Sequence, residues 1–166
     1  MKARFITLIR HAKSSWDDSR LTDKDRPLAS RGRRDAPLMA RRNRPLIESV
    51  EHFYCSTAER AHETFDLIHG ELHGFHADYN LTDELYTFSA RDVLKYCQQL
   101  PDNIYSVGIV GHNPALTEFI NLMTADSLAN LPTCAIARIR LKVDCWENIQ
   151  YETGKLVYYT CPKNYR

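Results

Sequence analysis

The feature of this chain that most limits its fold is the alternation of short β-rich runs with helical stretches along 166 residues. Between the β-rich runs, side chains recur at helical spacing, as in the series Ala61, Thr64, Phe65 and Ile68. Strands that alternate with helices are typical of layered α/β proteins. We therefore expect a three-layer α/β/α sandwich with a mostly parallel sheet and an antiparallel edge strand.

The expected strands are residues 4–9, 52–55, 77–81, 106–110, 134–143 and 156–160. The expected helices are residues 30–47, 57–72, 90–100 and 115–123. Pro37 falls inside the first of these helices, which predicts either a kink there or a helix that begins near Asp35 as its cap. Asn113 as a cap, with Pro114 at the first helical position, predicts the start of the last helix.

The length and composition of the chain fit one intracellular domain over residues 1–166. No apolar run approaches the roughly 18 residues that a membrane span needs. The first residues, MKARFITLIRH, carry charge too early for a secretory signal, so we expect a cytoplasmic protein. The five cysteines are odd in number and have no CxxC spacing, which argues against a disulfide framework or a zinc knuckle.

The basic residues gather in the first quarter of the chain. Residues 1–44 contain 13 Lys and Arg against five Asp and Glu, whereas the whole chain has a net charge of only +1. This asymmetry indicates an anionic ligand or partner, or a solvated basic face on the helix RGRRDAPLMARRNR. Nucleic acid is not expected as the partner, because aromatic residues do not interrupt the basic stretch and the isoelectric point is only about 7.7.

Several polar side chains follow the expected strands at the point where each strand ends. The first strand ends in Arg10 and His11, and the third clear strand, in GIVGHNPA, ends at His112. Arg60 lies on the first turn of the helix after the second strand, and Glu84 follows the short run near residue 80. Because ligands of parallel sheets bind outside the carboxyl ends of the strands, we expect these five side chains to converge.

This set of residues suits phosphoryl transfer. A neutral imidazole is a usable nucleophile at physiological pH. Two guanidinium groups can bind phosphoryl oxygens through forked hydrogen bonds and stabilise the charge of the transferring group. A second imidazole adds another donor, and a carboxylic acid can protonate a leaving group. The chemistry needs neither a metal nor another cofactor.

The only other histidine cluster is the stretch HGELHGFH, with His69, His73 and His76. His69 and His73 have the i, i+4 spacing of a metal clamp, but the stretch lacks the glutamate of an HExxH motif. Its two glycines suggest a fraying helix end, where histidines complement the helix dipole. We therefore expect no metal site.

The segments RHAKSSW, RPLASRGRRDAPLMA, STAERAHET and VGHNPAL together resemble the histidine phosphatase superfamily, with its phosphoglycerate mutase-like fold. The similarity runs from about Lys2 to Leu141 and is greatest to the small SixA-type phosphohistidine phosphatase branch. It implies that His11 accepts the phosphoryl group as a phosphohistidine intermediate, which water then hydrolyses. It also implies that Arg10, Arg60 and His112 form the phosphate pocket.

Other residues of these segments have less defined roles. Ala12 follows His11 where the common superfamily motif has glycine, and Lys13 stands where an acidic residue is frequent. Lys13 and Ser14 either donate to phosphate or only begin a loop. Arg26, in DRPL, either flanks the substrate mouth or serves in packing or a loop salt bridge. Larger relatives use a glutamate after the third strand as the acid, and Glu84 falls near that place, although DELYTFSA is not their motif; the alternative is a surface residue.

The expected function is a metal-independent phosphatase that acts on phosphohistidine in a protein. A short chain leaves little room for a lid, so an open site that admits a protein surface is expected. An open site also admits a sugar phosphate or another small phosphate ester, which makes a small-molecule phosphomonoesterase the second candidate. A phosphate-binding module without turnover is the third, although binding alone would not need a nucleophile beside two arginines.

Overall fold

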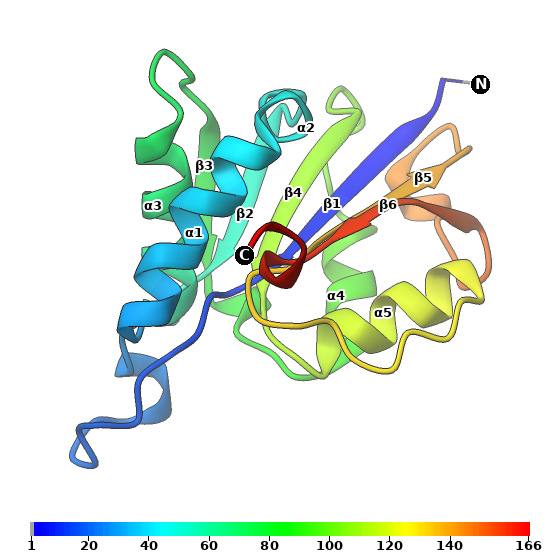
Figure 1. Ribbon diagram of the computed structural model, residues 1–166. Helices are drawn as coiled ribbons and strands as arrows, with labels where there is room; N and C mark the ends of the chain where they lie inside the picture. Colours follow the sequence, from blue (N-terminus) through cyan, green and yellow to red (C-terminus); the bar gives the residue numbers. More distant parts are fainter. Residues whose placement is uncertain (1) are drawn as a thin grey trace.

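The computed structural model describes residues 2–166, which form one six-stranded sheet between two layers of helices (Figure 1). The strands are β1 (Arg4–Arg10), β2 (His52–Ser56), β3 (Asp78–Thr82), β4 (Ser106–Gly111), β5 (Ile136–Leu141) and β6 (Gly154–Thr160). The helices are α1 (Ser30–Arg42), α2 (Arg44–Glu48), α3 (Glu59–Glu71), α4 (Ala90–Cys97) and α5 (Ala115–Thr124). Short 3₁₀ turns cover Asp23–Asp25, Asp83–Leu85, Trp146–Asn148 and Pro162–Tyr165.

The order of the strands in the sheet is β3-β2-β4-β1-β5-β6. The pairs β3–β2, β2–β4 and β4–β1 are parallel, whereas β5 is antiparallel to both β1 and β6. This arrangement confirms the predicted α/β fold with its antiparallel edge. Because β1 and β4 are neighbours in register, Arg10 pairs with Gly111, and their carboxyl ends lie side by side.

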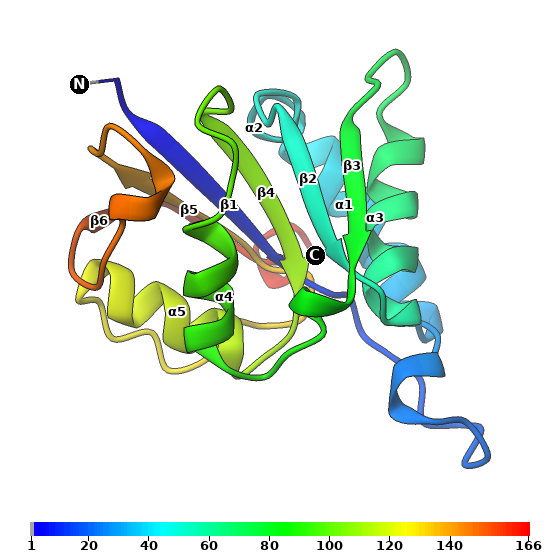
Figure 2. The same cartoon turned by 180° about the vertical axis from the view of Figure 1, so that it is seen from behind.

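The helices cover the two faces of the sheet in separate groups. α1 and α3 lie on one face, and α4 and α5 lie on the other (Figures 1 and 2). Each face has its own apolar core: one contains Met39, Phe53 and Phe65, and the other contains Phe119 and Trp146. The central strands are buried on both faces, which explains why residues 4–9 and 106–110 were recognisable as short continuous apolar runs.

The break in the first helical segment lies at Asn43, and the alternative that the helix begins near Asp35 is wrong. α1 runs from Ser30 through Pro37 to Arg42, and α2 follows after Asn43. Proline removes one hydrogen bond from α1, but Ala36, Met39 and Ala40 are buried in the core, and this packing keeps the helix continuous. The side-chain amide of Asn43 donates to the Met39 carbonyl at 3.0 Å and ends the helix.

The other predicted elements are present, with ends that differ by a few residues. α5 begins at Ala115 with Pro114 as its N-cap, one residue later than predicted, and Asn113 Oδ1 accepts the backbone N–H of Thr117 at 3.1 Å. Among the described residues, no helix is both long and apolar enough to cross a bilayer. The five cysteines are free thiols, and four of them are buried.

Candidate active site

A pocket of about 230 Å³ lies at the carboxyl ends of β1 and β4. It contains seven of the eight site residues that the sequence suggested. The lining residues are Arg10, His11, Lys13, Ser14, Trp16, Asp23, Arg26, Arg60, Phe88, His112, Asn113 and Thr133. The convergence predicted from distant segments of the chain is therefore present for every suggested residue except Glu84.

His11 follows the last residue of β1 and is held in one orientation. Its backbone N–H donates to the Gly111 carbonyl at 3.1 Å, which continues the β1–β4 pairing by one residue. Its ring Nδ1 lies 2.8 Å from the carbonyl oxygen of Ala12. Because a carbonyl oxygen only accepts hydrogen bonds, Nδ1 carries the proton and Nε2 carries the free lone pair. The ring nitrogen that is free to act as a nucleophile is therefore Nε2.

Helix α3 fixes the turn that follows His11. Thr64 on α3 accepts the backbone N–H of Ala12 at 2.9 Å and donates its hydroxyl to the carbonyl of Arg60 at 2.7 Å. Gly32 on α1 allows the same turn to pass close by, because a Cβ there would lie 2.3 Å from the carbonyl oxygen of Lys13. The orientation of the imidazole thus depends on contacts with both α3 and α1.

Three other side chains of the pocket each have one buried nitrogen without a partner. Arg10 donates from Nη1 to the Leu131 carbonyl at 2.9 Å, and Nε2 of His112 lies 2.7 Å from the Ser56 hydroxyl. Within residues 2–166, only four buried side-chain polar atoms lack a hydrogen-bond partner. They are Arg10 Nε, Arg60 Nε, His112 Nδ1 and Asp35 Oδ1.

Three of these four unpartnered atoms therefore belong to residues that surround His11. The rings of His11 and His112 are 5.2 Å apart between centroids. Buried donors are seldom left unpaired, since an unsatisfied polar group costs about 1–3 kcal/mol. The arrangement is that of a site whose missing hydrogen bonds an anion would supply.

Both imidazoles of the pocket are uncharged over a wide range of pH. Burial is the main factor that lowers the pKa of His11 to about 3; the hydrogen bond to Ala12 opposes it, and the charges of Arg60 and Arg10 add to it. Burial also lowers the pKa of His112 to about 3, with help from His11 and Arg60. Neutral rings next to fixed guanidinium charges leave a lone pair available at neutral pH.

These pKa values predict how stability depends on pH in a buffer free of binding anions. Between pH 6.5 and 3, the unfolded histidines bind protons that the folded protein excludes, so the free energy of unfolding falls as the pH falls. Above pH 6.5 neither form binds these protons, and the contribution is constant. Urea unfolding of wild type, His11→Gln and His112→Gln at pH 7 and pH 5 measures the effect. Between pH 7 and pH 5, we expect the free energy of unfolding of each variant to fall by about 2 kcal/mol less than that of wild type. Equal decreases would contradict the lowered pKa values.

The secondary candidates Lys13, Ser14 and Arg26 all line the pocket, but they differ in their free donors. Lys13 is exposed and has no ion pair in the described part of the chain. Arg26 is buried and uses its donors within the loop, where Nη1 donates to the Ser14 hydroxyl at 3.0 Å and Nη2 to Asp23 at 3.3 Å. The loop salt bridge proposed as the alternative role of Arg26 is thus present.

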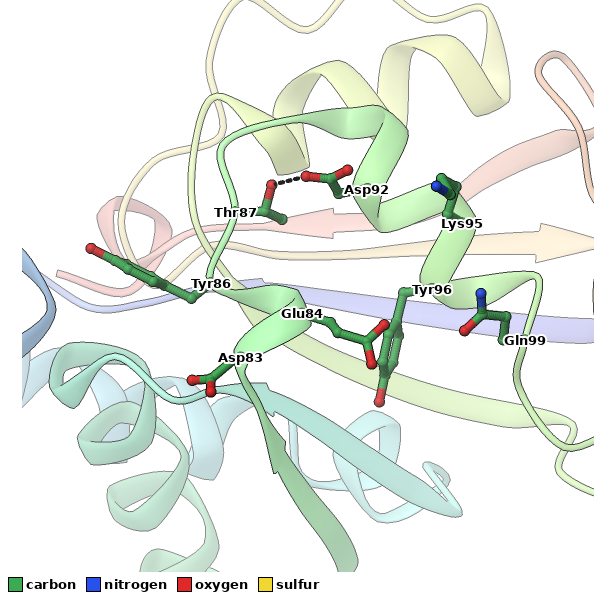
Figure 3. A pocket seen from close by; sticks show the side chains of 8 residues that line it. All are labelled: Asp83, Glu84, Tyr86, Thr87, Asp92, Lys95, Tyr96 and Gln99. Atoms are coloured by element: carbon green, nitrogen blue, oxygen red, sulfur yellow. Dashed lines mark hydrogen bonds between the residues drawn. The ribbon is translucent and has the colours of Figure 1, made fainter.

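Glu84 does not lie in this pocket. It lines a neighbouring pocket of about 330 Å³ together with Tyr96, Lys95 and Asp92 (Figure 3). Glu84 is exposed, whereas the next residue, Leu85, is buried in the core. The 3₁₀ turn after β3 therefore directs the two side chains differently, and the structure does not bring Glu84 to the residues around His11.

Five residues of the pocket were not named as site residues from the sequence: Trp16, Asp23, Phe88, Asn113 and Thr133. Asp23 stands three residues before Arg26 in TDKDRPL, and this proximity to a matched segment was the only signal for it. Trp16 is 71% exposed and Phe88 is 47% exposed. The pocket thus has apolar surface at its mouth and polar donors at its base.

The histidines of the HGELHGFH stretch form no candidate metal centre. His69 stacks against Phe65, and its Nε2 accepts the backbone N–H of Ala77 at 3.3 Å. Across the part of the chain that the structure describes, no group of three or more His, Cys, Asp or Glu side chains is placed to hold a metal ion.

Known proteins resemble this chain in sequence and in fold. Residues 6–92 match the family model of the histidine phosphatase superfamily (branch 1). An uncharacterised protein of Mycobacterium leprae is 30% identical over 93% of this chain and 100% of its own length. The structure of the protein histidine phosphatase SixA complexed with tungstate matches with a TM-score of 0.80 and 22% identity, over 98% of this chain and 99% of that one.

Two further solved structures are similar. A candidate phosphohistidine phosphatase, SixA, from Agrobacterium tumefaciens matches with a TM-score of 0.82 and 23% identity, over 98% of this chain and 100% of that one. A mycobacterial glucosyl-3-phosphoglycerate phosphatase matches with a TM-score of 0.64 and 11% identity, over 94% of this chain and 98% of that one.

Proposed function

The chain belongs to the histidine phosphatase superfamily and is a phosphatase, and on this premise we propose that it transfers the phosphoryl group of phosphohistidine in a protein to His11 and then to water. The observation that carries the proposal is that three unpartnered buried nitrogens belong to residues that surround the free Nε2 of His11. The proposed site is His11 as nucleophile, with Arg10, Arg60 and His112 as the phosphate pocket. A cytoplasmic location remains a prediction.

In the first step, the lone pair of His11 Nε2 attacks phosphorus while the bond from phosphorus to the leaving nitrogen breaks. Arg10, Arg60 and His112 donate to the equatorial oxygens, whose charge must be stabilised in the transition state. The proton on Nδ1 stays on the ring and donates to the Ala12 carbonyl, so the phosphorylated imidazole is cationic. That positive charge makes His11 a good leaving group for the second step.

In the second step, water attacks phosphorus and the bond from phosphorus to Nε2 breaks. The electron pair of that bond returns to Nε2, which restores the neutral ring with its proton on Nδ1. The attacking water gives its proton to solvent or to the product phosphate. Neither step requires a metal ion, and the second step requires no protein acid.

The chemistry of the pocket supports a nitrogen leaving group. The only carboxyl among the lining residues is that of Asp23. Partial burial would raise its pKa, but hydrogen bonds from Tyr86 and Arg60 outweigh that effect and lower the pKa to about 2. Asp23 is therefore ionised at neutral pH and cannot protonate an alkoxide. A phosphohistidine whose ring is protonated leaves as a neutral imidazole without such help.

A small-molecule phosphomonoesterase is the second candidate. The structural similarity to a glucosyl-3-phosphoglycerate phosphatase favours it, because that protein is named for a small phosphorylated substrate. Substrate comparison separates the two candidates. We expect kcat/KM to be highest for a histidine-phosphorylated protein, lower for an aryl phosphate and lowest for a sugar phosphate, with an acid-labile phosphoenzyme trapped during turnover. A higher kcat/KM for the sugar phosphate would overturn the choice of substrate, and turnover without a phosphoenzyme would overturn the mechanism.

The exposed aromatic residues predict a difference between large and small substrates. The guanidinium carbon of Arg26 lies 3.4 Å from the ring centroid of Trp16. Most of the tryptophan surface is exposed and can contact a protein substrate. We expect Trp16→Ala to lower kcat/KM for a histidine-phosphorylated protein roughly tenfold, since an exposed tryptophan at an interface contributes strongly to binding. Phosphoramidate, which has no protein surface, should be hydrolysed within about twofold of the wild-type rate.

A matched control for this variant is Leu122→Ala, because Leu122 is also an exposed apolar residue, on α5, and does not line the pocket. It should leave both substrates unaffected. If Trp16→Ala slowed both substrates equally, the tryptophan would serve the loop and not the recognition of a protein.

A further inference from the structure

Asp23 accepts two hydrogen bonds from the guanidinium of Arg60. Arg60 donates from Nη1 to the Asp23 backbone carbonyl at 2.6 Å and from Nη2 to Oδ2 of the carboxylate at 3.0 Å. Tyr86 donates its hydroxyl to the same Oδ2 at 2.6 Å. Arg60 is 2% exposed, so these two acceptors fix the direction of its guanidinium. Its Nε remains without a partner.

The other oxygen of the carboxylate connects Arg60 to the loop at the mouth. Arg26 donates to Oδ1 of Asp23 from Nη2 at 3.3 Å, and Arg26 Nη1 donates to Ser14 at 3.0 Å. Residues 12–28 project beyond the sheet as one excursion, closed by a bridge between Ser14 and Leu28 (Figures 1 and 2). One carboxylate therefore joins this excursion to α3 and, through Tyr86, to the turn after β3.

Asp23 is also the only anion in a strongly cationic pocket. The lining residues include Arg10, Lys13, Arg26 and Arg60, but a single carboxylate. A negative charge next to Arg60 repels a bound phosphate dianion while it holds the arginine in place. The Asp23 side chain is 43% exposed, so solvent moderates this repulsion without removing it.

We propose that Asp23 is a positioning residue that holds Arg60 with Nε free for the transferring phosphoryl group and that weakens the binding of product phosphate. The proposal rests on the proposed function, because it assigns Asp23 a part in the same phosphoryl transfer. Asp23 acts through Arg60 and donates no proton. The hydrogen bonds from Arg60 to Asp23 raise kcat, whereas the negative charge of Asp23 lowers the affinity for phosphate. Kinetic measurements can separate these two effects.

The first variant is Asp23→Asn, assayed on an aryl phosphate with inorganic phosphate as competitive inhibitor. The amide can accept from one donor but cannot replace both carboxylate oxygens, so Arg60 becomes misplaced. We expect kcat to fall about 10- to 100-fold, the range that a small misplacement of a catalytic group produces. The inhibition constant of phosphate should also fall, roughly three- to tenfold, because a repelling charge is gone.

The second variant, Asp23→Glu, separates charge from geometry. It keeps the negative charge but moves the carboxylate by one methylene. We expect the inhibition constant of phosphate to stay within about twofold of wild type, because the charge is retained. The kcat should still be reduced, because the contact with Arg60 is displaced.

The matched control is Asp25→Asn. Asp25 lies two residues away in the same turn, accepts only the Thr22 hydroxyl at 2.9 Å and does not line the pocket. It should leave kcat and the inhibition constant unchanged. Circular dichroism and thermal unfolding show whether each variant is folded before it is assayed.

Several results would overturn the proposal. If Asp23→Asn lowered kcat but weakened phosphate binding, the proposed repulsion of product phosphate by Asp23 would be excluded. Unchanged kinetics in this variant would exclude any role in turnover. An inhibition constant of phosphate that was clearly lower in Asp23→Glu than in wild type would exclude the charge effect. All of these outcomes differ from a failure of the proposed function, which wild-type protein would reveal by forming no phosphoenzyme.

Discussion

Replacement of His11 by alanine is expected to abolish the phosphoenzyme and to lower kcat by more than roughly 10⁴-fold. The other imidazole of the pocket does not replace His11, because Nε2 of His112 is engaged with Ser56. The pocket nitrogens of Arg10, Arg60 and His112 remain in the variant, so binding of inorganic phosphate should persist. Rapid acid-free quench with ³²P-labelled substrate measures the phosphoenzyme, and isothermal calorimetry measures phosphate binding.

His62→Ala is the control for this experiment. His62 lies on α3, three residues after the start of the helix, and pairs only with Asp66 at 3.3 Å. This variant should retain the wild-type kcat and phosphoenzyme level. A His11→Ala protein that turned over at more than about one hundredth of the wild-type rate would contradict the covalent mechanism.

Arg60→Ala is expected to produce the second-largest loss, about 10²- to 10³-fold in kcat, which is typical for removal of one donor to a developing charge. The substitution removes a buried cation and leaves the Asp23 carboxylate with a repulsive effect on the phosphoryl group. The KM should therefore rise together with the fall in kcat. Steady-state kinetics on an aryl phosphate measures both quantities, with thermal unfolding to verify that the variant is folded.

Arg33→Ala is a suitable comparison for Arg60→Ala. Arg33 is 51% exposed in its side chain, lies on α1 and pairs with Glu63 at 3.0 Å. Since exposed ion pairs contribute only about 0–1 kcal/mol, this variant should keep nearly full activity. Equal losses in the two variants, or a loss below about fivefold for Arg60→Ala, would show that Arg60 does not bind the transferring group.

The fold was predictable from the sequence wherever burial left a clear pattern. The central strands β1 and β4 are buried on both faces and read as short apolar runs. β3 is an exposed edge strand, so its pattern was weak. Pro37 was misleading, because a local preference against a helix was outweighed by the packing of α1 on the core. Asn43, which ends α1, also accepts a hydrogen bond from Tyr158, a tertiary contact that no local pattern reveals.

The candidate site was predictable to the extent that topology determines it. His11, Arg60 and His112 follow parallel strands, and the ends of such strands meet at one edge of a sheet. Glu84 also follows a strand, but the direction of its side chain depends on a 3₁₀ turn that buries Leu85. The role of Asp23 could not be predicted, because its partners Arg60 and Tyr86 lie 37 and 63 residues away along the chain.

The proton on His11 Nδ1 was equally inaccessible to sequence reasoning. Its position follows from one backbone carbonyl, that of Ala12, and from the turn that Thr64 holds in place. The sequence predicts which residue reacts, whereas the structure adds which of its ring nitrogens is free to react.

The most direct test of the phosphoryl-transfer geometry is a crystal structure of the protein with vanadate, which adopts the shape of a phosphoryl group in transfer. We expect vanadium bonded to Nε2 of His11, with Arg10 Nε, Arg60 Nε and His112 Nδ1 each about 3 Å from a vanadate oxygen. Vanadate bound through Nδ1 of His11, or held elsewhere while those three nitrogens stay unpartnered, would contradict the proposed site.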